Sequence, residues 1–292
     1  MKISQIGEFG LIDALKAFAP VSKDVIKGIG DDAAVLPYSK SEYQLLTTDM
    51  LAEGVHFTRR MPPQAIGHKA LACNISDIAA MGGYPTFAVV SIGLPKDFSV
   101  HFIKGVYKGM QRTAQAFNVS IVGGDTIKTD KMVINIALLG LVEKKCLVTR
   151  DGAKPWDWIF VTGPLGGSLK SGRHLNFNPR LAQARFLVEN FKPNAMMDIS
   201  DGLAGDLNHI LQESQVGARL DHDSIPRHKG ASLSQAFNDG EDFELLFTLS
   251  AKNAAALMDW QTKERSFYFY PIGTITANAK EKIDSKSFTH FR

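Results

Sequence analysis

The stretch KALACNISDIAAMGGYP, residues 69–85, carries an aspartate near the end of an apolar segment. Residues 64–81 follow Pro62 and Pro63 and are rich in alanine, so they predict a buried helix. Asp77 would lie near the carboxyl end of this helix, where the helix dipole disfavours a negative charge by about 0.3–1 kcal/mol. A bound cation would remove that penalty. The stretch therefore predicts a cation-binding aspartate at the end of a core helix.

Four further stretches end an apolar run with a small residue or glycine followed by aspartate: GIGDDAAV (28–35), LLTTDM (45–50), SIVGGDTI (120–127) and MMDISDGL (196–203). Any one of these aspartates alone is more often a cap or turn residue, by roughly two to one. Together, carboxylates at the ends of core segments repel one another unless a divalent ion lies among them. Oxygen ligands from Asp, Thr and Ser suit Mg²⁺ rather than zinc or copper. The pattern predicts a site with several Mg²⁺ ions that handles phosphates.

The composition is that of a globular chain. It has 292 residues, of which 45% are hydrophobic and 22% charged, a length of about two domains of roughly 150 residues each. The net charge of +3 is scattered, and the basic doublets are too short for a nucleic-acid-binding stripe. The two cysteines lie far apart, outside any C-x-x-C spacing, which fits a reducing cytoplasm. No run of 18 apolar residues occurs, so we expect no membrane segment.

Helices and strands alternate along the chain. Apolar residues have helical spacing within 9–18 and 103–117. Runs rich in Val, Ile, Leu and aromatic residues predict strands at 32–37, 43–48, 86–93, 119–122, 132–142, 157–162, 194–198, 243–249 and 267–273. A charged break at 143–145 and the loop at 150–155 mark the best boundary, with residues 1–142 on one side and residues 151–292 on the other. We therefore predict an α/β or α+β fold of two domains with these boundaries.

Two glycine-rich stretches mimic nucleotide-binding loops. Residues 28–33 match G-x-G-x-x-A, but two aspartates would face the pyrophosphate, which leaves the dinucleotide-binding interpretation about a one-in-twenty chance. Residues 163–171 do not match G-x-x-x-x-G-K-S in any register and predict a turn that opens a helix. The glycine pair at 123–124 is the better phosphate cradle, because residues without side chains allow a close approach.

No other catalytic pattern is as well supported. The histidines form no H-E-x-x-H motif, and no nucleophile elbow is present. His56 alone would be structural about three times in four, but it follows Asp49 closely and is a candidate for contact with a substrate. Glu241 precedes a strand pattern that includes Glu244, so Glu241 is freer to meet a ligand.

The order of these motifs resembles one family. The series GIGDDAAV, TTDMLAEGVHF, KALACNISDIAAMGGYP, GGDT, TRDGAKPWDWIFVTG, MDISDGLAGDLNHI and GEDFELLFT spans almost the whole chain and resembles the thiamine-monophosphate kinase family. The resemblance implies that the γ-phosphoryl group of ATP is transferred to thiamine monophosphate, giving thiamine diphosphate. It also implies the aminoimidazole ribonucleotide synthetase-like fold. In that fold the N-terminal α/β domain binds Mg²⁺ and ATP and dimerises through its mixed sheet, and an α+β domain follows.

The resemblance assigns site residues as well. On the family's Mg²⁺ positions fall Asp32, Thr47, Thr48, Asp49, Asp77, Asp125, Asp198 and Asp201. On its ATP contacts fall Gly124, Asp125, Arg150 and Ser200. On its thiamine-phosphate contacts fall His56, Glu241 and Phe288. The stretch after Val161 is shorter than in many members, so the resemblance implies no local structure there.

The implied reaction explains why the motifs contain no catalytic His or Cys. Transfer to a phosphate oxygen needs no strong base, because the acceptor is already an anion. The obstacle is repulsion between two polyanions, which several Mg²⁺ ions held by aspartates can neutralise. Two alternatives stay open: another ATP-dependent synthetase of the same superfamily, and a non-catalytic protein that binds cations or nucleotides.

Overall fold

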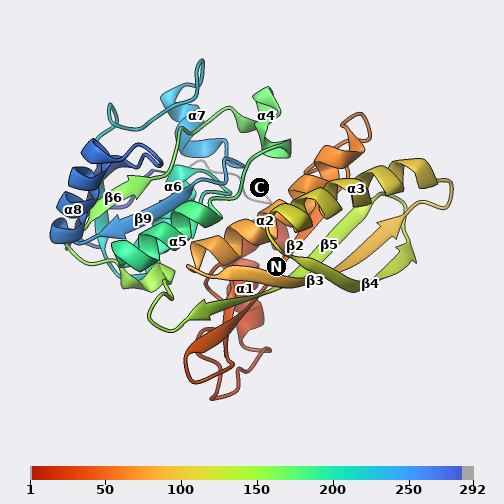
Figure 1. Cartoon of the computed structure of the whole chain (residues 1–292), viewed down its shortest axis with the longest axis horizontal. Helices are drawn as coiled ribbons and strands as arrows, with labels where there is room; N and C mark the ends of the chain where they lie inside the picture. The colour runs from red at the N-terminus through yellow and green to blue at the C-terminus, as the bar shows by residue number, and fades with distance from the viewer. Residues whose placement is uncertain (1, 285–292) are drawn as a thin grey trace.

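The computed structural model describes residues 2–284, apart from the side chain of Phe9, and contains two five-stranded sheets (Figure 1). The first sheet has the strand order β1-β2-β5-β3-β4. Its strands are β1 (Ala34–Pro37), β2 (Glu42–Ala52), β3 (Tyr84–Leu94), β4 (Ser120–Lys128) and β5 (Val133–Glu143). Only β3 and β4 pair in parallel within this sheet. Helices α2 (Pro63–Ala80) and α3 (Val100–Ala116) cover one of its faces.

The second sheet follows in the chain and is antiparallel throughout, with the order β7-β9-β6-β10-β8. Its strands are β6 (Trp158–Val161), β7 (Ala195–Asp198), β8 (Gly217–Leu220), β9 (Leu245–Leu249) and β10 (Tyr270–Thr276). The helices of this half are α4 (Ser168–Ser171), α5 (Leu181–Asn190), α6 (Leu203–Glu213), α7 (Leu233–Asn238) and α8 (Ala251–Lys263). Short 3₁₀ turns are η1 (Arg150–Gly152) and η2 (Arg173–Leu175).

Helix α2 lies at the centre of the molecule. It packs against the first sheet and α3 on one side and against α5, β7 and η2 of the second half on the other, so 14 of its 18 residues are buried. Gly67 and Gly109 let α2 and α3 approach closely: a Cβ at either glycine would lie 1.9 Å from a backbone oxygen of the other helix. A helix with small and apolar residues on every side is stable only inside a core. The alanine-rich sequence of α2 predicted this burial.

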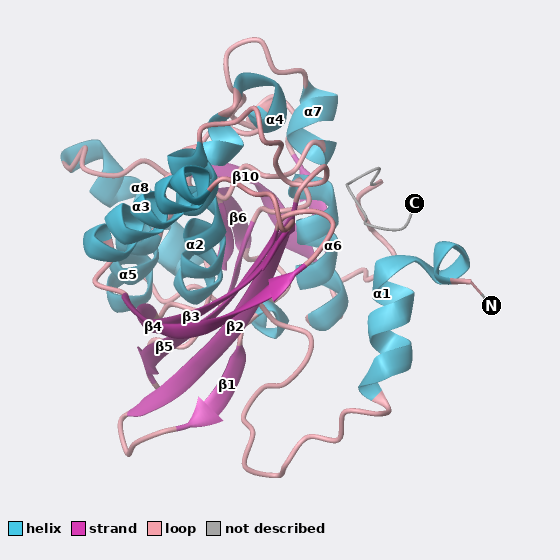
Figure 2. Cartoon of the chain, turned by 90° about the vertical axis from the view of Figure 1, so that its right-hand side faces the viewer, coloured by secondary structure: helices cyan, strands magenta, loops and turns pink. Residues whose placement is uncertain are grey.

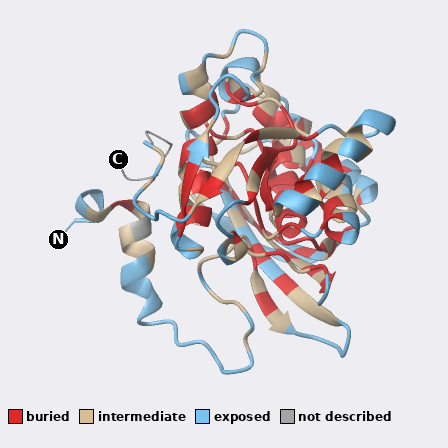
Figure 3. Ribbon diagram, turned by 90° about the vertical axis from the view of Figure 1, so that its left-hand side faces the viewer, coloured by how far each residue is buried: buried red, intermediate tan, exposed pale blue. Residues whose placement is uncertain are grey.

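Helix α1 (Ile3–Lys16) is less embedded. Figure 2 shows it beside the main body, joined to β1 by a long loop. Its chain bends at Gly7, which has a φ of 69°. Buried residues concentrate between the helices and sheets of the body, whereas residues 17–24 are exposed (Figure 3).

The fold class is confirmed, and nearly all predicted elements are present. Each of the nine predicted strands overlaps an observed strand, and the helix predicted at 64–81 is α2. The turn predicted at 163–171 does open a helix, α4. Strand β8 escaped prediction because its four residues, GARL, lack the run of Val, Ile, Leu or aromatic residues that marked the other strands. In the part of the chain that the structure describes, no helix is long and apolar enough to cross a membrane.

The face of the first sheet opposite α2 and α3 carries exposed apolar side chains. They come from β2, β3 and β4: Leu46, Met50, Phe87, Val89, Val122 and Ile127, each between 39% and 61% exposed. Side chains alternate between the two faces of a strand, so the intervening residues of β2, Leu45 and Thr47, are buried under α2. An apolar sheet face of this kind marks a surface for association.

Trp156 offers a test of backbone strain. It adopts a φ of 75° and its side chain is 76% exposed. The left-handed region costs a residue with a Cβ about 1–2 kcal/mol, and glycine avoids that cost. We expect Trp156→Gly to raise the free energy of unfolding by about 1 kcal/mol, after the greater flexibility of glycine in the unfolded chain is subtracted. Urea unfolding would measure the change. Trp156→Ala keeps the Cβ and should give no such gain, and equal stabilisation by both variants would contradict the explanation.

Candidate active site

Three aspartates from distant parts of the chain meet between the two sheets. Carboxylate oxygens of Asp32, Asp77 and Asp198 all lie within 4.8 Å of one another. Asp32 precedes β1, Asp77 lies in the last turn of α2, and Asp198 ends β7. The Thr47 hydroxyl donates to Asp77 Oδ2 at 2.6 Å, and the Ser76 hydroxyl donates to Asp198 Oδ2 at 2.5 Å. These are three of the predicted metal ligands, and we call them the aspartate cluster.

The electrostatics of the aspartate cluster favour a cation. Burial and the neighbouring carboxylates raise the pKa of Asp198 to about 8 and hold the pKa of Asp77 well above its usual range. Burial also raises the pKa of Asp32, although the Arg150 guanidinium opposes the rise. The buried Asp32 Oδ2 has no hydrogen-bond partner among residues 2–284. An orphaned carboxylate oxygen among oxygen-only donors fits a hard divalent ion such as Mg²⁺.

Asp49 lies beside this cluster on β2. Its backbone N–H donates to the Asn74 side-chain oxygen of α2 at 3.1 Å, which ties the strand to the helix. Burial, followed by the charges of Asp32 and Glu241, raises the pKa of Asp49 to about 6. The carboxyl groups therefore resist ionising together until positive charge arrives.

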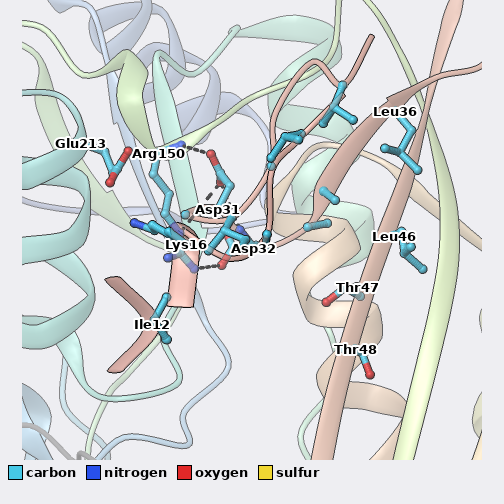
Figure 4. A pocket seen from close by; sticks show the side chains of 18 of the residues that line it. Ile12, Lys16, Asp31, Asp32, Leu36, Leu46, Thr47, Thr48, Arg150 and Glu213 are labelled. Atoms are coloured by element: carbon cyan, nitrogen blue, oxygen red, sulfur yellow. Dashed lines mark hydrogen bonds and ion pairs between the residues drawn. The ribbon is translucent and has the colours of Figure 1, made fainter. Parts of the chain in front are cut away.

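A cavity of about 670 Å³ opens beside Asp32, one member of the aspartate cluster (Figure 4). Asp31, Asp32, Arg150 and Thr47 line it, together with Lys16 of α1. The Arg150 guanidinium pairs with Asp32, and the Arg150 backbone N–H donates to Asp31 Oδ2 at 3.2 Å. Burial, followed by the charge of Asp32, raises the pKa of Asp31 to about 7.

A second cavity, of about 390 Å³, reaches the other two members of the cluster. Asp49, Asp77 and Asp198 line it. So do the remaining sequence-predicted contacts of this region, namely His56, Ser200, Asp201 and Glu241. Asp32 belongs to the first cavity and the other two cluster members to the second, so the aspartate cluster separates two compartments that each reach it. That arrangement suits a group passed from a ligand in one cavity to a ligand in the other.

Two predicted substrate contacts, His56 and Glu241, are held by their neighbours. His56 Nδ1 accepts a hydrogen bond from the Ala52 backbone N–H at 3.0 Å, so a neutral imidazole would carry its proton on Nε2. Glu241 pairs with the ammonium of Lys69, a fully buried residue of α2 that the sequence patterns did not single out. The signal was available, because a lysine inside a helix buried on all sides needs an anionic partner.

Asp206 is a second residue that sequence reasoning missed. Its Oδ2 accepts from the backbone N–H groups of Asp201 and Gly202, each at 3.1 Å, and so holds the start of α6. Asp201, Asp206 and His209 also have ligand atoms within 4.8 Å of one another. Gly202 is the N-cap of α6, so Asp201 precedes the helix and does not cap it.

Three predicted residues lie apart from the aspartate cluster within one chain. The register runs Asp49 to Ile136, Ile136 to Val90 and Val90 to Gly124, so Gly124 and Asp125 lie three strands from Asp49, a distance of about 14 Å. The Thr48 side chain points to the face of the sheet opposite α2. Its hydroxyl donates a hydrogen bond to the Ile136 carbonyl oxygen at 3.1 Å. Phe288 lies outside the described residues.

This fold and site define an α/β protein of the AIR synthase class. The family of AIR synthase related proteins matches residues 30–142 with its N-terminal domain and residues 150–286 with its C-terminal domain.

Relatives with known names narrow the class. A thiamine-monophosphate kinase of Aquifex aeolicus is 36% identical over 278 residues, covering 85% of this chain and 87% of that one. One of Bacillus subtilis is 33% identical and covers 98% and 99% of the two chains. A solved structure described as "AaThiL complexed with AMPPCP and TMP" superposes with a TM-score of 0.87 at 33% identity, covering 99% of both chains. The chain belongs to the thiamine-monophosphate kinase family.

Proposed function

We propose that this protein transfers the γ-phosphoryl group of ATP to thiamine monophosphate, producing thiamine diphosphate and ADP. The observation that carries the proposal is the aspartate cluster between two cavities. The relative bound to AMPPCP and TMP supports the identity of the two ligands. We assign ATP to the larger cavity and thiamine monophosphate to the smaller one, so that donor and acceptor phosphates meet at the cluster.

The protein's part in this reaction is to hold charge and orientation. Asp32, Asp77 and Asp198, with Asp49 and Thr47 beside them and Asp201 across the smaller cavity, would hold Mg²⁺. Bound Mg²⁺ would neutralise the phosphate oxygens and favour in-line displacement. The acceptor phosphate is itself the nucleophile, so no side chain has to remove a proton. His56 and Glu241 orient the acceptor, and Arg150 contacts ATP from the larger cavity. Ser200 lines the smaller cavity, so it would contact ATP only where the γ-phosphate reaches the acceptor.

Arg150→Ala should affect ATP and spare the acceptor. A guanidinium near the phosphates gains strength as charge moves in the transition state, so we expect the KM for ATP to rise about tenfold and kcat to fall. The KM for thiamine monophosphate should stay within about twofold. Steady-state kinetics would measure all three. Arg219→Ala is the matched control, because Arg219 is 75% exposed and its ion pair with Glu281 lies on the surface. An effect confined to the acceptor KM would contradict the assignment.

We propose further that the protein is a homodimer whose first sheets face each other. The exposed apolar side chains of β2, β3 and β4 support this arrangement. It would also account for the residues that lie apart from the cluster. Asp125 and Gly124 on β4 would reach the site of the partner subunit, where Thr48, on the same exposed face, would meet them. Residues 1–142 would then form the domain that dimerises and binds Mg²⁺ and ATP, and residues 151–292 would form the second domain. The two buried free cysteines fit a cytoplasmic location.

The direct test is ADP release with purified protein, ATP and Mg²⁺, with and without thiamine monophosphate. We expect ADP to form only when the acceptor is present, together with an equal amount of thiamine diphosphate. Another synthetase of the superfamily would release ADP with a different acceptor. A non-catalytic binder would release none with any acceptor.

A further inference from the structure

A buried ammonium group lies next to the acceptor cavity without lining it. Lys69 of α2 is 0% exposed. Its Nζ donates to Glu241 Oε2 and, at 3.2 Å, to the backbone carbonyl oxygen of His56. These two partners are the described residues assigned to the acceptor, and they come from opposite halves of the chain. A fully buried lysine is expensive unless it is paired, so these contacts fix its position.

Glu241 needs such an anchor because its backbone is strained. Glu241 and Phe243 have φ values of 56° and 51°, in the left-handed region that residues with a Cβ avoid. The loop is held at the backbone by two bonds: Glu241 N–H to the Ser200 carbonyl at 2.7 Å, and Phe243 N–H to the Ile199 carbonyl at 2.8 Å. Strain of this kind persists where surrounding contacts over-determine it, and it is concentrated at ligand sites. The Glu241 side chain pairs with the Lys69 ammonium, and this ion pair fixes its direction.

The ion pair of Lys69 with Glu241 also affects the charge that the acceptor meets in the smaller cavity. The smaller cavity is lined by many carboxyl groups, including Asp49, Asp77, Asp198, Asp201 and Asp239, and by no lysine or arginine of the described residues. Thiamine monophosphate brings a cationic ring and an anionic phosphate. An unpaired Glu241 would attract the ring but repel the phosphate, and it would be free to turn toward any cation bound at Asp49. With one carboxylate oxygen held by Lys69, Glu241 can present only its other oxygen to the acceptor.

We propose that Lys69 is a positioning residue for the acceptor, which fixes the Glu241 carboxylate and the His56 loop across the two halves of the molecule so that both face the acceptor ring. The proposal rests on the proposed function for the identity of the acceptor. It assigns Lys69 no contact with the reacting phosphates.

A double-mutant cycle tests this role. We would measure the binding of thiamine monophosphate by calorimetry, with Mg²⁺ and without nucleotide, for wild type, Lys69→Met, Glu241→Gln and the double variant. We expect Lys69→Met to weaken binding at least about tenfold in the wild-type background and less than about twofold in the Glu241→Gln background. The KM for ATP should change less than about twofold in each variant. Lys252→Met, at an exposed position of α8, is the control and should change neither constant.

Several outcomes would overturn the proposal. A full-sized loss from Lys69→Met in the Glu241→Gln background would mean that Lys69 contacts the acceptor itself. Unchanged binding in Lys69→Met would mean that the pair is only structural. If Lys69→Met alone does not fold, the double variant can still be compared with Glu241→Gln, because the double variant removes both charges of the pair and the amide oxygen of glutamine can still accept a hydrogen bond from Lys69. Wild-type protein that forms no ADP with thiamine monophosphate would instead refute the proposed function, whatever the cycle gives.

Discussion

Replacing Asp77 with asparagine is expected to lower kcat by about a thousandfold or more while the protein stays folded. Asp77 lies in the aspartate cluster, where removing one charged ligand removes stabilisation of the charge that develops in the transition state. Asparagine still accepts the hydrogen bond from Thr47. It also removes one of three carboxyl groups that resist ionising together, so the variant should unfold at a higher temperature than wild type when EDTA is present.

The measurement combines ADP release with thermal unfolding followed by circular dichroism. Asp259→Asn is the matched control, because Asp259 forms an exposed ion pair with Lys263 on α8 and should leave activity unchanged. Asp77→Asn activity within a few-fold of wild type would refute the metal-binding role. So would a loss of the folded state, because Asp77 would then be a structural residue.

The second large effect concerns Asp125, which lies about 14 Å from Asp49 within one chain. Asp125→Asn alone is expected to lower kcat at least about a hundredfold, since it would remove a ligand from the site of the partner subunit. Co-expression with Asp77→Asn should restore activity. In a mixed dimer one site combines both substitutions, and the other combines an intact Asp77 with an intact Asp125 of the partner subunit.

The size of the recovery can be stated in advance. Random assembly makes about half of the dimers mixed, and each has one intact site of two, so about a quarter of wild-type activity should return. Different affinity tags on the two chains would allow the mixed dimer to be isolated, with about half of wild-type activity per dimer. An inactive mixed dimer would show that Asp125 does not act across the interface. Wild-type activity in Asp125→Asn would remove the residue from the site altogether.

The aspartate cluster could be predicted from the sequence because each member ends an apolar run. The apolar runs at Asp32 and Asp198 border strands, and the apolar run at Asp77 forms the end of α2. Each carboxyl group therefore had to lie at the edge of a core. Which edges meet is set by sheet order, and no local pattern contains it. This is why Asp125, on β4, was grouped with residues that lie three strands away.

Residues that act through long-range pairing escaped prediction. Lys69 is ordinary for a helix until its burial is known, and Asp206 resembles any acid in a first helical turn. Their partners, Glu241 for Lys69 and the backbone at 201–202 for Asp206, depend on the conformation of loops. Strand β8 was missed for a similar reason, since its place in the sheet comes from pairing with β10.

The burial of α2 on all sides has a consequence for folding. One continuous apolar core contains Leu71 and Ile75 of α2 together with Phe160, Phe247 and Phe269 of the second sheet. The second half also has an apolar core of its own, but without α2 it would expose Phe160, Phe247 and Phe269, and without those side chains the first half would expose one side of α2. The two halves should therefore melt in a single cooperative transition, and either half expressed alone should aggregate. If the second half were exchanged for that of a distant relative, α2 would pack against side chains that do not match its surface. We therefore expect the two halves to have evolved together.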